Sequence, residues 1–251
     1  MKKKIYSLLL VILSVVLIPS CSSESKTMGN KIARLCEMIA EGNNEEAVRL
    51  AEGIRDRNAQ SSRVPRRVDA LEGEVTTPLV KACETGNADM IIWLLEHGAR
   101  TDYAPGNILY PLEAFCDNGS GAGMDALQKL LEYGADPEQY KNRPPLFRLA
   151  QTLRHRSEKT KEIGVKMVLT VLENGAAWQD PTDDFTILHY AAMQENTDFL
   201  TALLEKKEAA DFLNTKNYKG QTPLDLAEQF GNAECIRILR EEGALEGSKS
   251  E

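Results

Sequence analysis

The sequence predicts an all-α repeat fold, a solenoid of about five helix-turn-helix units preceded by an N-terminal helical cap. The phrase TPLVKACETGNADMIIWLLEHGA, which begins at Thr77, returns at Thr222 as TPLDLAEQFGNAECIRILREEGA. Related triplets begin at Thr77, Tyr110, Pro144, Thr186 and Thr222, at intervals of 33 to 42 residues. A short apolar helix and then a second helix follow each triplet. Because a catalytic motif usually occurs once, a recurring phrase indicates a structural building block.

Residues 1–20 have the features of an export signal. Three lysines at positions 2–4 precede an almost unbroken aliphatic run over Leu8–Ile18, and the sequence IPSC follows. The run is short for a membrane span. Its end resembles a bacterial lipobox, so we expect a lipoprotein signal peptide over residues 1–20 and a lipid on Cys21. The alternative is an ordinary secretory signal that is cut elsewhere.

Residues 21–28 are predicted to form a short tether that begins with the lipidated Cys21. The lipobox resemblance implies a lipid-anchored protein of the bacterial cell envelope. Ser22 favours the outer membrane, by analogy with bacterial sorting, with the chain facing the periplasm or the surface. Residues 29–75 are predicted to form the N-terminal helical cap and a connector, because residues 32–54 have the two-helix pattern of the later units but no triplet. Terminal repeats, which have only one neighbour, often differ in this way.

The charge of the chain excludes some partners. The net charge is −8, and without residues 1–20, which hold three lysines and no acids, it becomes 27 − 38 = −11. Such an acidic surface repels nucleic acid. We therefore expect no nucleic-acid partner and contact with the membrane through the lipid anchor only. Independently of its charge, the chain is expected to be a monomer.

Over residues 76–245 the repeating unit resembles the ankyrin repeat, in which a β-turn finger leads into two antiparallel helices. The segment LNTKNYKGQTPLDLA, residues 213–227, is similar to the finger and first helix of that family almost throughout. Glycines 98, 134, 175 and 243 are predicted to end second helices in the left-handed conformation. Residues 246–251 are predicted to be a tail.

The resemblance implies a non-catalytic protein–protein interaction scaffold that binds, protects or inhibits a protein partner, including an immunity-type role against a toxin. Two alternatives stay open. The chain could be an accessory subunit that supports a periplasmic enzyme, or a self-associating structural component of the envelope.

By position in the family, partner contacts are expected at the finger tips and along the exposed faces of the first helices. Aromatic residues amid polar ones are typical of a binding surface, although any single tyrosine could instead pack against its neighbouring finger. The candidate residues are Arg100, Asp102, Tyr103, Asn107, Tyr110, Glu138, Tyr140, Asn142, Asp183, Asp184, Phe185, Lys216, Asn217 and Tyr218. Trp178 aligns with an apolar position and is predicted to lie in the core.

The sequence offers no recognisable catalytic or metal-binding group, so we expect neither an enzyme nor a cofactor or metal. The three histidines do not have metal-ligand spacing, and the resemblance implies a structural hydrogen bond for His189. Cysteines 36, 83, 116 and 235 are expected to be packed in the core. Cys83 and Cys116 occupy equivalent helices, roughly 8–10 Å apart, which is farther than the about 7 Å that a disulfide allows.

The third unit departs from the pattern through about ten extra residues, Arg154–Ile163, between its helices. These residues and Lys166 form a basic region on an acidic protein. Two interpretations remain: a solvated extension of a helix, or a docking site for an acidic part of a partner.

Overall fold

The computed structural model describes residues 30–60, 76–104, 108–117, 123–153, 158–194 and 196–247. The predicted signal peptide, the tether with Cys21 and residues 61–75 of the connector lie outside the described residues. Within these ranges the regular structure is helical, and an isolated bridge pairs Gln179 with Thr186. None of the described helices combines the length and the apolar character that a membrane span needs.

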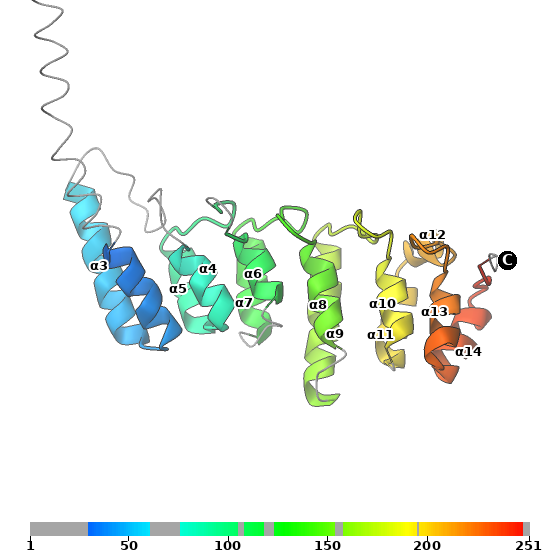
Figure 1. Ribbon diagram of the computed structural model, residues 1–251. Helices are drawn as coiled ribbons and strands as arrows, with labels where there is room; N and C mark the ends of the chain where they lie inside the picture. Colours follow the sequence, from blue (N-terminus) through cyan, green and yellow to red (C-terminus); the bar gives the residue numbers. More distant parts are fainter. Residues whose placement is uncertain are drawn as a thin grey trace, which may run out of the picture.

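The described helices form pairs that follow one another along a single elongated stack (Figure 1). At one end the cap joins a helix over residues 30–40 to α3 (Asn44–Gln60). The five units that follow are α4 (Pro78–Thr85) with α5 (Ala88–Glu96), α6 (Pro111–Asp117) with α7 (Gly123–Glu132), α8 (Pro145–Leu153) with α9 (Glu158–Glu173), α10 (Ile187–Met193) with α11 (Thr197–Leu204), and α13 (Pro223–Phe230) with α14 (Ala233–Glu241). A short helix, α12 (Ala209–Phe212), lies between the last two units.

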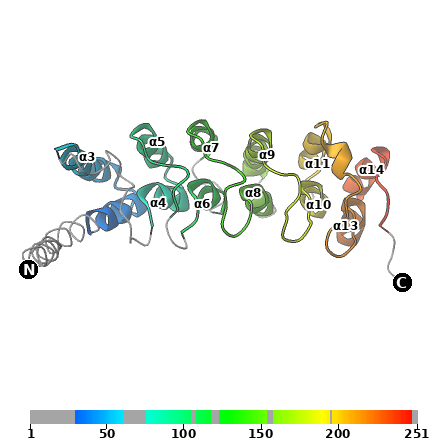
Figure 2. The same cartoon turned by 90° about the horizontal axis from the view of Figure 1, so that it is seen from above.

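The helices form two layers, which Figure 2 shows from above. The first helices α4, α6, α8, α10 and α13 make one row, and the second helices α5, α7, α9, α11 and α14 make the other. Successive first helices contact one another. Among the second helices, α5 contacts α7, α7 contacts α9, and α11 contacts α14. The predicted all-α repeat solenoid with a helical cap is therefore confirmed.

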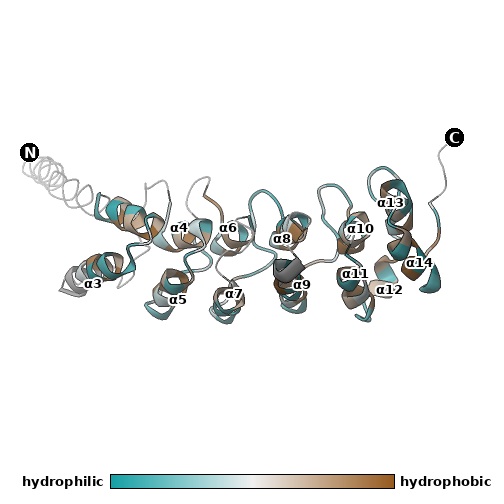
Figure 3. Ribbon diagram, turned by 90° about the horizontal axis from the view of Figure 1, so that it is seen from below, coloured by the Kyte–Doolittle hydropathy of each residue, from teal (hydrophilic) through white to brown (hydrophobic). Residues whose placement is uncertain are grey.

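The core runs along the stack between the two rows. The leucine that ends each triplet is at most 1% exposed in all five units: Leu79, Leu112, Leu146, Leu188 and Leu224. Leu94, Leu95, Leu130 and Leu203 of the second helices are also buried. In Figure 3 most helices carry both apolar and polar residues, as expected for helices that bury one side and expose the other.

Local sequence signals set the ends of the helices. The hydroxyl oxygens of Thr77, Thr186 and Thr222 accept hydrogen bonds from backbone N–H groups at the starts of α4, α10 and α13. Gly98, Gly134, Gly175 and Gly243 have φ values between 83° and 100°, in the left-handed region, as predicted. The fourth unit has no such glycine, and α12 follows α11 there.

The predicted core residues outside the triplets are confirmed. The four described cysteines carry thiols and are buried. Burial raises the pKa of Cys83 and of Cys116, so these thiols stay protonated and are weak nucleophiles. Trp178 is 9% exposed and stacks on Phe212, with ring centroids 5.6 Å apart.

The insertion in the third unit lengthens a helix. Helix α9 begins at Glu158, inside the inserted segment, and continues without a break through residue 163. Residues 154–157 lie outside the described residues. The α8–α9 pair therefore extends beyond its neighbours at the edge where the two helices of each unit are joined (Figure 1).

Candidate partner-binding face

The loops that join successive units, called fingers here, lie in sequence along one edge of the stack (Figure 1). They connect α5 to α6, α7 to α8, α9 to α10, and α12 to α13. Backbone and side-chain hydrogen bonds link each finger to the next. These links fix the positions of the finger tips relative to one another.

The third residue of the first helix provides one set of links. In the second unit this residue is Glu113, which is 0% exposed and accepts backbone N–H bonds from Lys141 and Asn142 of the next finger, both at 3.1 Å. In the fourth unit it is His189, whose Nε2 lies 3.0 Å from the Gln221 carbonyl oxygen. In the fifth it is Asp225, which accepts from the Gly247 N–H at 3.0 Å. One helix position thus connects its own unit to the following segment.

His189 also has a defined protonation state. Its Nδ1 accepts a hydrogen bond from the Thr186 N–H at 3.0 Å, which leaves the proton on Nε2 to be donated to Gln221. Burial lowers the pKa of His189 below its ordinary value and outweighs the hydrogen bond to Gln221, which acts in the opposite direction. The ring is therefore neutral and structural, as the resemblance implied.

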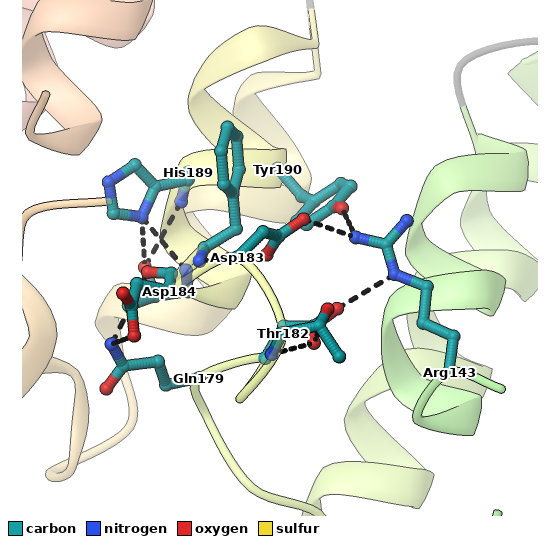
Figure 4. Close-up of polar contacts among 10 residues, drawn as sticks. Arg143, Gln179, Thr182, Asp183, Asp184, His189 and Tyr190 are labelled. Atoms are coloured by element: carbon teal, nitrogen blue, oxygen red, sulfur yellow. Dashed lines mark hydrogen bonds and ion pairs between the residues drawn. The ribbon is translucent and has the colours of Figure 1, made fainter. Parts of the chain in front are cut away.

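The third unit has an apolar residue, Phe147, at the same helix position, and a different link replaces the missing one (Figure 4). Arg143 donates from Nε to Asp180 at 2.8 Å, and from Nη2 to Asp183 at 3.1 Å and to the hydroxyl of Tyr190. Asp180 is 0% exposed, and its second oxygen accepts from both the N–H and the hydroxyl of Thr182. One guanidinium thus joins its own finger to the next finger and to α10.

The charges in this cluster are compensated. Burial opposes the charge of Arg143, but the hydrogen bond to Asp180 and the neighbouring acids raise the pKa of the guanidinium above its ordinary value. Burial raises the pKa of Tyr190 to about 12, so its hydroxyl is neutral and accepts the bond from Arg143. A buried acid is stable when its oxygens are paired and hydrogen-bonded in this way.

The candidate contact residues divide by exposure. Those that are exposed are Asp102, Glu138, Asn142, Asp184, Lys216 and Tyr218. Those that are partly buried are Arg100, Tyr103, Tyr110, Tyr140, Asp183 and Phe185. Asn107 lies outside the described residues. Tyr218 is 62% exposed, which makes it the most accessible of the large apolar side chains at the described finger tips.

Basic side chains lie over aromatic rings at several finger tips. The Arg100 guanidinium lies 5.5 Å from the Tyr103 ring, and the Lys141 ammonium lies 5.6 Å from the Tyr110 ring. Farther along the stack, Lys219 lies 5.3 Å from the ring of the exposed Tyr218. Cations over ring faces hold these side chains in place and leave their edges accessible.

Asn217 needs a correction, because its side chain is only 4% exposed. Its Oδ1 accepts from the backbone N–H groups of Lys219 at 2.9 Å and Gln221 at 3.1 Å. Asp180 and Asp136 make comparable bonds to the N–H two residues later in their own fingers. Asn217 therefore shapes the finger from within and is not an accessible contact for a partner.

The sequence reasoning missed the residues that connect the fingers, above all Glu113, Arg143, Asp180 and Tyr190. One signal was present. Aligning the triplets places Glu113, His189 and Asp225 at the same position of a mostly buried helix, where a recurring polar residue indicates a recurring hydrogen bond. No comparable pattern pointed to Arg143, whose partners lie 37 to 47 residues later in the chain.

Residues 159–249 match the family model described as ankyrin repeats in three copies. This segment of the chain carries ankyrin repeats. Over 178 residues, or 70% of the chain, it is 29% identical to the ankyrin repeat protein nuc-2 of Neurospora crassa. Over 64 residues, or 26% of the chain, it is 39% identical to a putative E3 ubiquitin-protein ligase, XBAT31, of Arabidopsis thaliana.

These matches cover 15% and 13% of the two relatives, so the chain corresponds to a small part of each. The roles that the names of these two relatives state are roles of those relatives. Ankyrin repeats as a class mediate protein–protein interaction and are generally non-catalytic. Within the described ranges, no group of three or more histidine, cysteine, aspartate or glutamate side chains could hold a metal ion.

Proposed function

We propose that this chain is a lipid-anchored scaffold of the bacterial envelope that binds one protein partner through its finger face. The observation that carries the proposal is the row of exposed polar and aromatic tips on fingers that are joined to one another by buried hydrogen bonds. A surface fixed in advance loses little conformational entropy when a partner binds. Binding is reversible, and it protects, inhibits or localises the partner, as in an immunity protein that neutralises a toxin.

The charge of the tips indicates the kind of partner surface that fits. Acidic Asp102, Glu138 and Asp184 lie on the first three fingers, and basic Lys216 and Lys219 lie on the fourth, all of them exposed. A surface with both signs of charge suits a partner with a complementary pattern and gives specificity more than affinity. Tyr218 supplies apolar contact area at the end of this row.

The binding proposal is tested by charge reversal on the finger face. We expect Asp102→Arg combined with Asp184→Arg to reduce the yield of the partner captured from an envelope extract at least tenfold, because reversed charges face those of the partner. The matched control is Glu96→Arg combined with Glu205→Arg, two exposed positions at the ends of second helices. Equal capture by the two double variants would contradict the assignment of the face.

The anchoring proposal is tested separately at Cys21. The variant Cys21→Ser removes the only atom that could carry the lipid at the predicted site, so we expect the protein to move to the soluble periplasmic fraction. The measurement is fractionation of cells followed by immunodetection. Membrane association that persists in the variant would refute the lipid anchor and leave the binding proposal unaffected.

A further inference from the structure

The junction between the third and fourth units, called the seam here, is packed less closely than the junctions between the other repeat units. Among the described first helices, α8 and α10 make the fewest contacts of any successive pair. Among the second helices, α9 and α11 make fewer contacts than α5 with α7, α7 with α9, or α11 with α14. Because each unit of a repeat protein contacts only its neighbours, a stack bends most easily where two units are packed least.

A cleft of about 320 Å³ lies at the same seam, at the edge of the stack opposite the fingers. Its walls include Leu153 at the end of α8 and Met193 at the end of α10, one from each side of the seam. Phe230 and Asn232 of the fifth unit also line it. Protein interiors are close-packed and hold few spaces of this size. The ends of α8 and α10 therefore have room to move relative to each other.

Hydrogen bonds and ion pairs of side chains cross the seam in several places. Arg143, in the finger before α8, bonds to Asp180, Asp183 and Tyr190 of the fourth unit (Figure 4). Further links among the described residues are the Ala177 N–H to Glu138 at 2.9 Å, the Gln194 amide to the Ala150 carbonyl at 3.0 Å, and the partly exposed ion pair of Lys206 with Glu173. Exposed ion pairs contribute little to stability. Arg143, which reaches a fully buried acid, is therefore the main side-chain link described across the seam.

An aromatic contact crosses the seam between the first helices. The rings of Phe147 on α8 and Tyr190 on α10 have centroids 5.8 Å apart, and the two residues are 0% and 8% exposed. This contact lies in the row where the two units still touch, whereas the second helices α9 and α11 are packed least. A rotation about the contact would change the separation of α9 from α11 and keep the two rings together.

The fourth unit is attached more firmly to the fifth unit than to the third. Helix α10 makes more contacts with α13 than with α8. In the finger before α10, the centroid of the Phe185 ring lies 5.7 Å from that of Tyr190 and 6.2 Å from that of Tyr218 in the next finger. Trp178 of the same finger stacks on Phe212 of α12. The fourth and fifth units thus form one block, called the C-terminal block, and the cap with the first three units forms the N-terminal block.

We propose that the seam is a hinge between these two blocks, and that Arg143 is the latch that fixes its angle. The three bonds of the guanidinium hold the fourth unit against the third, and without them the blocks rotate about the contact of α8 with α10. The exposed tips Asp102 and Glu138 belong to the N-terminal block, and Asp184 and Tyr218 belong to the C-terminal block. The angle of the hinge therefore sets how far apart these tips lie.

The hinge does not depend on the proposed function, because it follows from the packing and the bonds between units. If a partner contacts tips of both blocks, it fits one angle of the hinge best and selects that angle. The test of the hinge uses no partner, so its outcome is independent of the capture experiment on the finger face.

The test measures distances between two spin labels by double electron–electron resonance in the whole chain. The labels are attached to introduced cysteines in a Cys21→Ser background, whose other described cysteines are buried. The pair Asp125→Cys and Asp198→Cys joins α7 to α11 across the seam. The matched pair, Asp89→Cys and Lys166→Cys, joins α5 to α9 within the N-terminal block, and all four positions are exposed. We expect a broader distribution of distances across the seam, and equal widths for the two pairs would overturn the proposal.

Variants of the latch test the role of Arg143. Arg143→Gln should broaden or shift the distribution across the seam and leave that of the matched pair unchanged. Arg143→Lys keeps a charge beside Asp180 but not the planar fork, so it should fold even if Arg143→Gln does not, and it should give a smaller change. The control is Arg148→Gln, since Arg148 pairs with Asp117 and Glu113 of the second unit, and it should alter neither distribution. An unchanged distribution across the seam in the folded Arg143 variants, or an equal change in Arg148→Gln, would overturn the proposal.

Discussion

Replacing Asp180 by alanine should destabilise the stack more than any change at an exposed finger residue. The carboxylate is fully buried, accepts two bonds from Thr182 and pairs with Arg143 at 2.8 Å. Breaking a buried ion pair costs about 3–5 kcal/mol. The Arg143 side chain is 24% exposed and keeps Asp183 and Tyr190, so the lower end applies. We expect a loss of about 3 kcal/mol in the free energy of unfolding, or roughly 6–12 °C in melting temperature.

The assay is thermal unfolding followed by circular dichroism at 222 nm, with urea unfolding as a second measurement. The matched control is Asp184→Asn in the same finger, since Asp184 is exposed and asparagine tolerates its φ of 58°. This control should change the free energy of unfolding by less than about 0.5 kcal/mol. Equal melting temperatures for the two variants would show that the link through Arg143 does not hold the third and fourth units together.

Three further predictions follow from buried groups. Burial lowers the pKa of His189 in the folded chain, so the unfolded chain takes up a proton on this histidine at a higher pH than the folded chain does. The free energy of unfolding should therefore fall as the pH drops below about 6.5. Urea titrations at several pH values should show a smaller fall in His189→Gln. Leu146→Ala, at a position that is 0% exposed, should cost about 2–5 kcal/mol in urea unfolding, and a loss below 1 kcal/mol would contradict the packing described for the core. In a Cys21→Ser background the four buried thiols should react with a maleimide only after unfolding, and rapid labelling of the native chain would show that they are accessible.

The fold could be predicted because its signals are local. The leucine of each triplet and the glycine after most second helices recur within a few residues of the helix ends that they define. Each residue type suits its position for a physical reason: the leucine fills the space between the two rows of helices, and glycine enters the left-handed region at little cost. Where the fourth unit lacks the glycine, the structure has the additional helix α12.

The candidate site was predicted less completely, because position in a finger does not determine which way a side chain points. Lys216, Asn217 and Tyr218 are consecutive, yet the outer two are exposed and Asn217 is turned inward to bond its own finger. The links made by Arg143 depend on residues that only the stacking of units brings together.

The central claim, that the finger face is where a protein partner binds, is tested most directly by photo-crosslinking in cells that produce the native partner. A photoreactive phenylalanine analogue replaces Tyr218 at the finger face or Glu96 at the end of a second helix, both exposed positions. We predict one discrete crosslinked protein at position 218 and none at position 96, with mass spectrometry identifying the partner. Crosslinking to the same protein at position 96 but not at position 218 would contradict the claim.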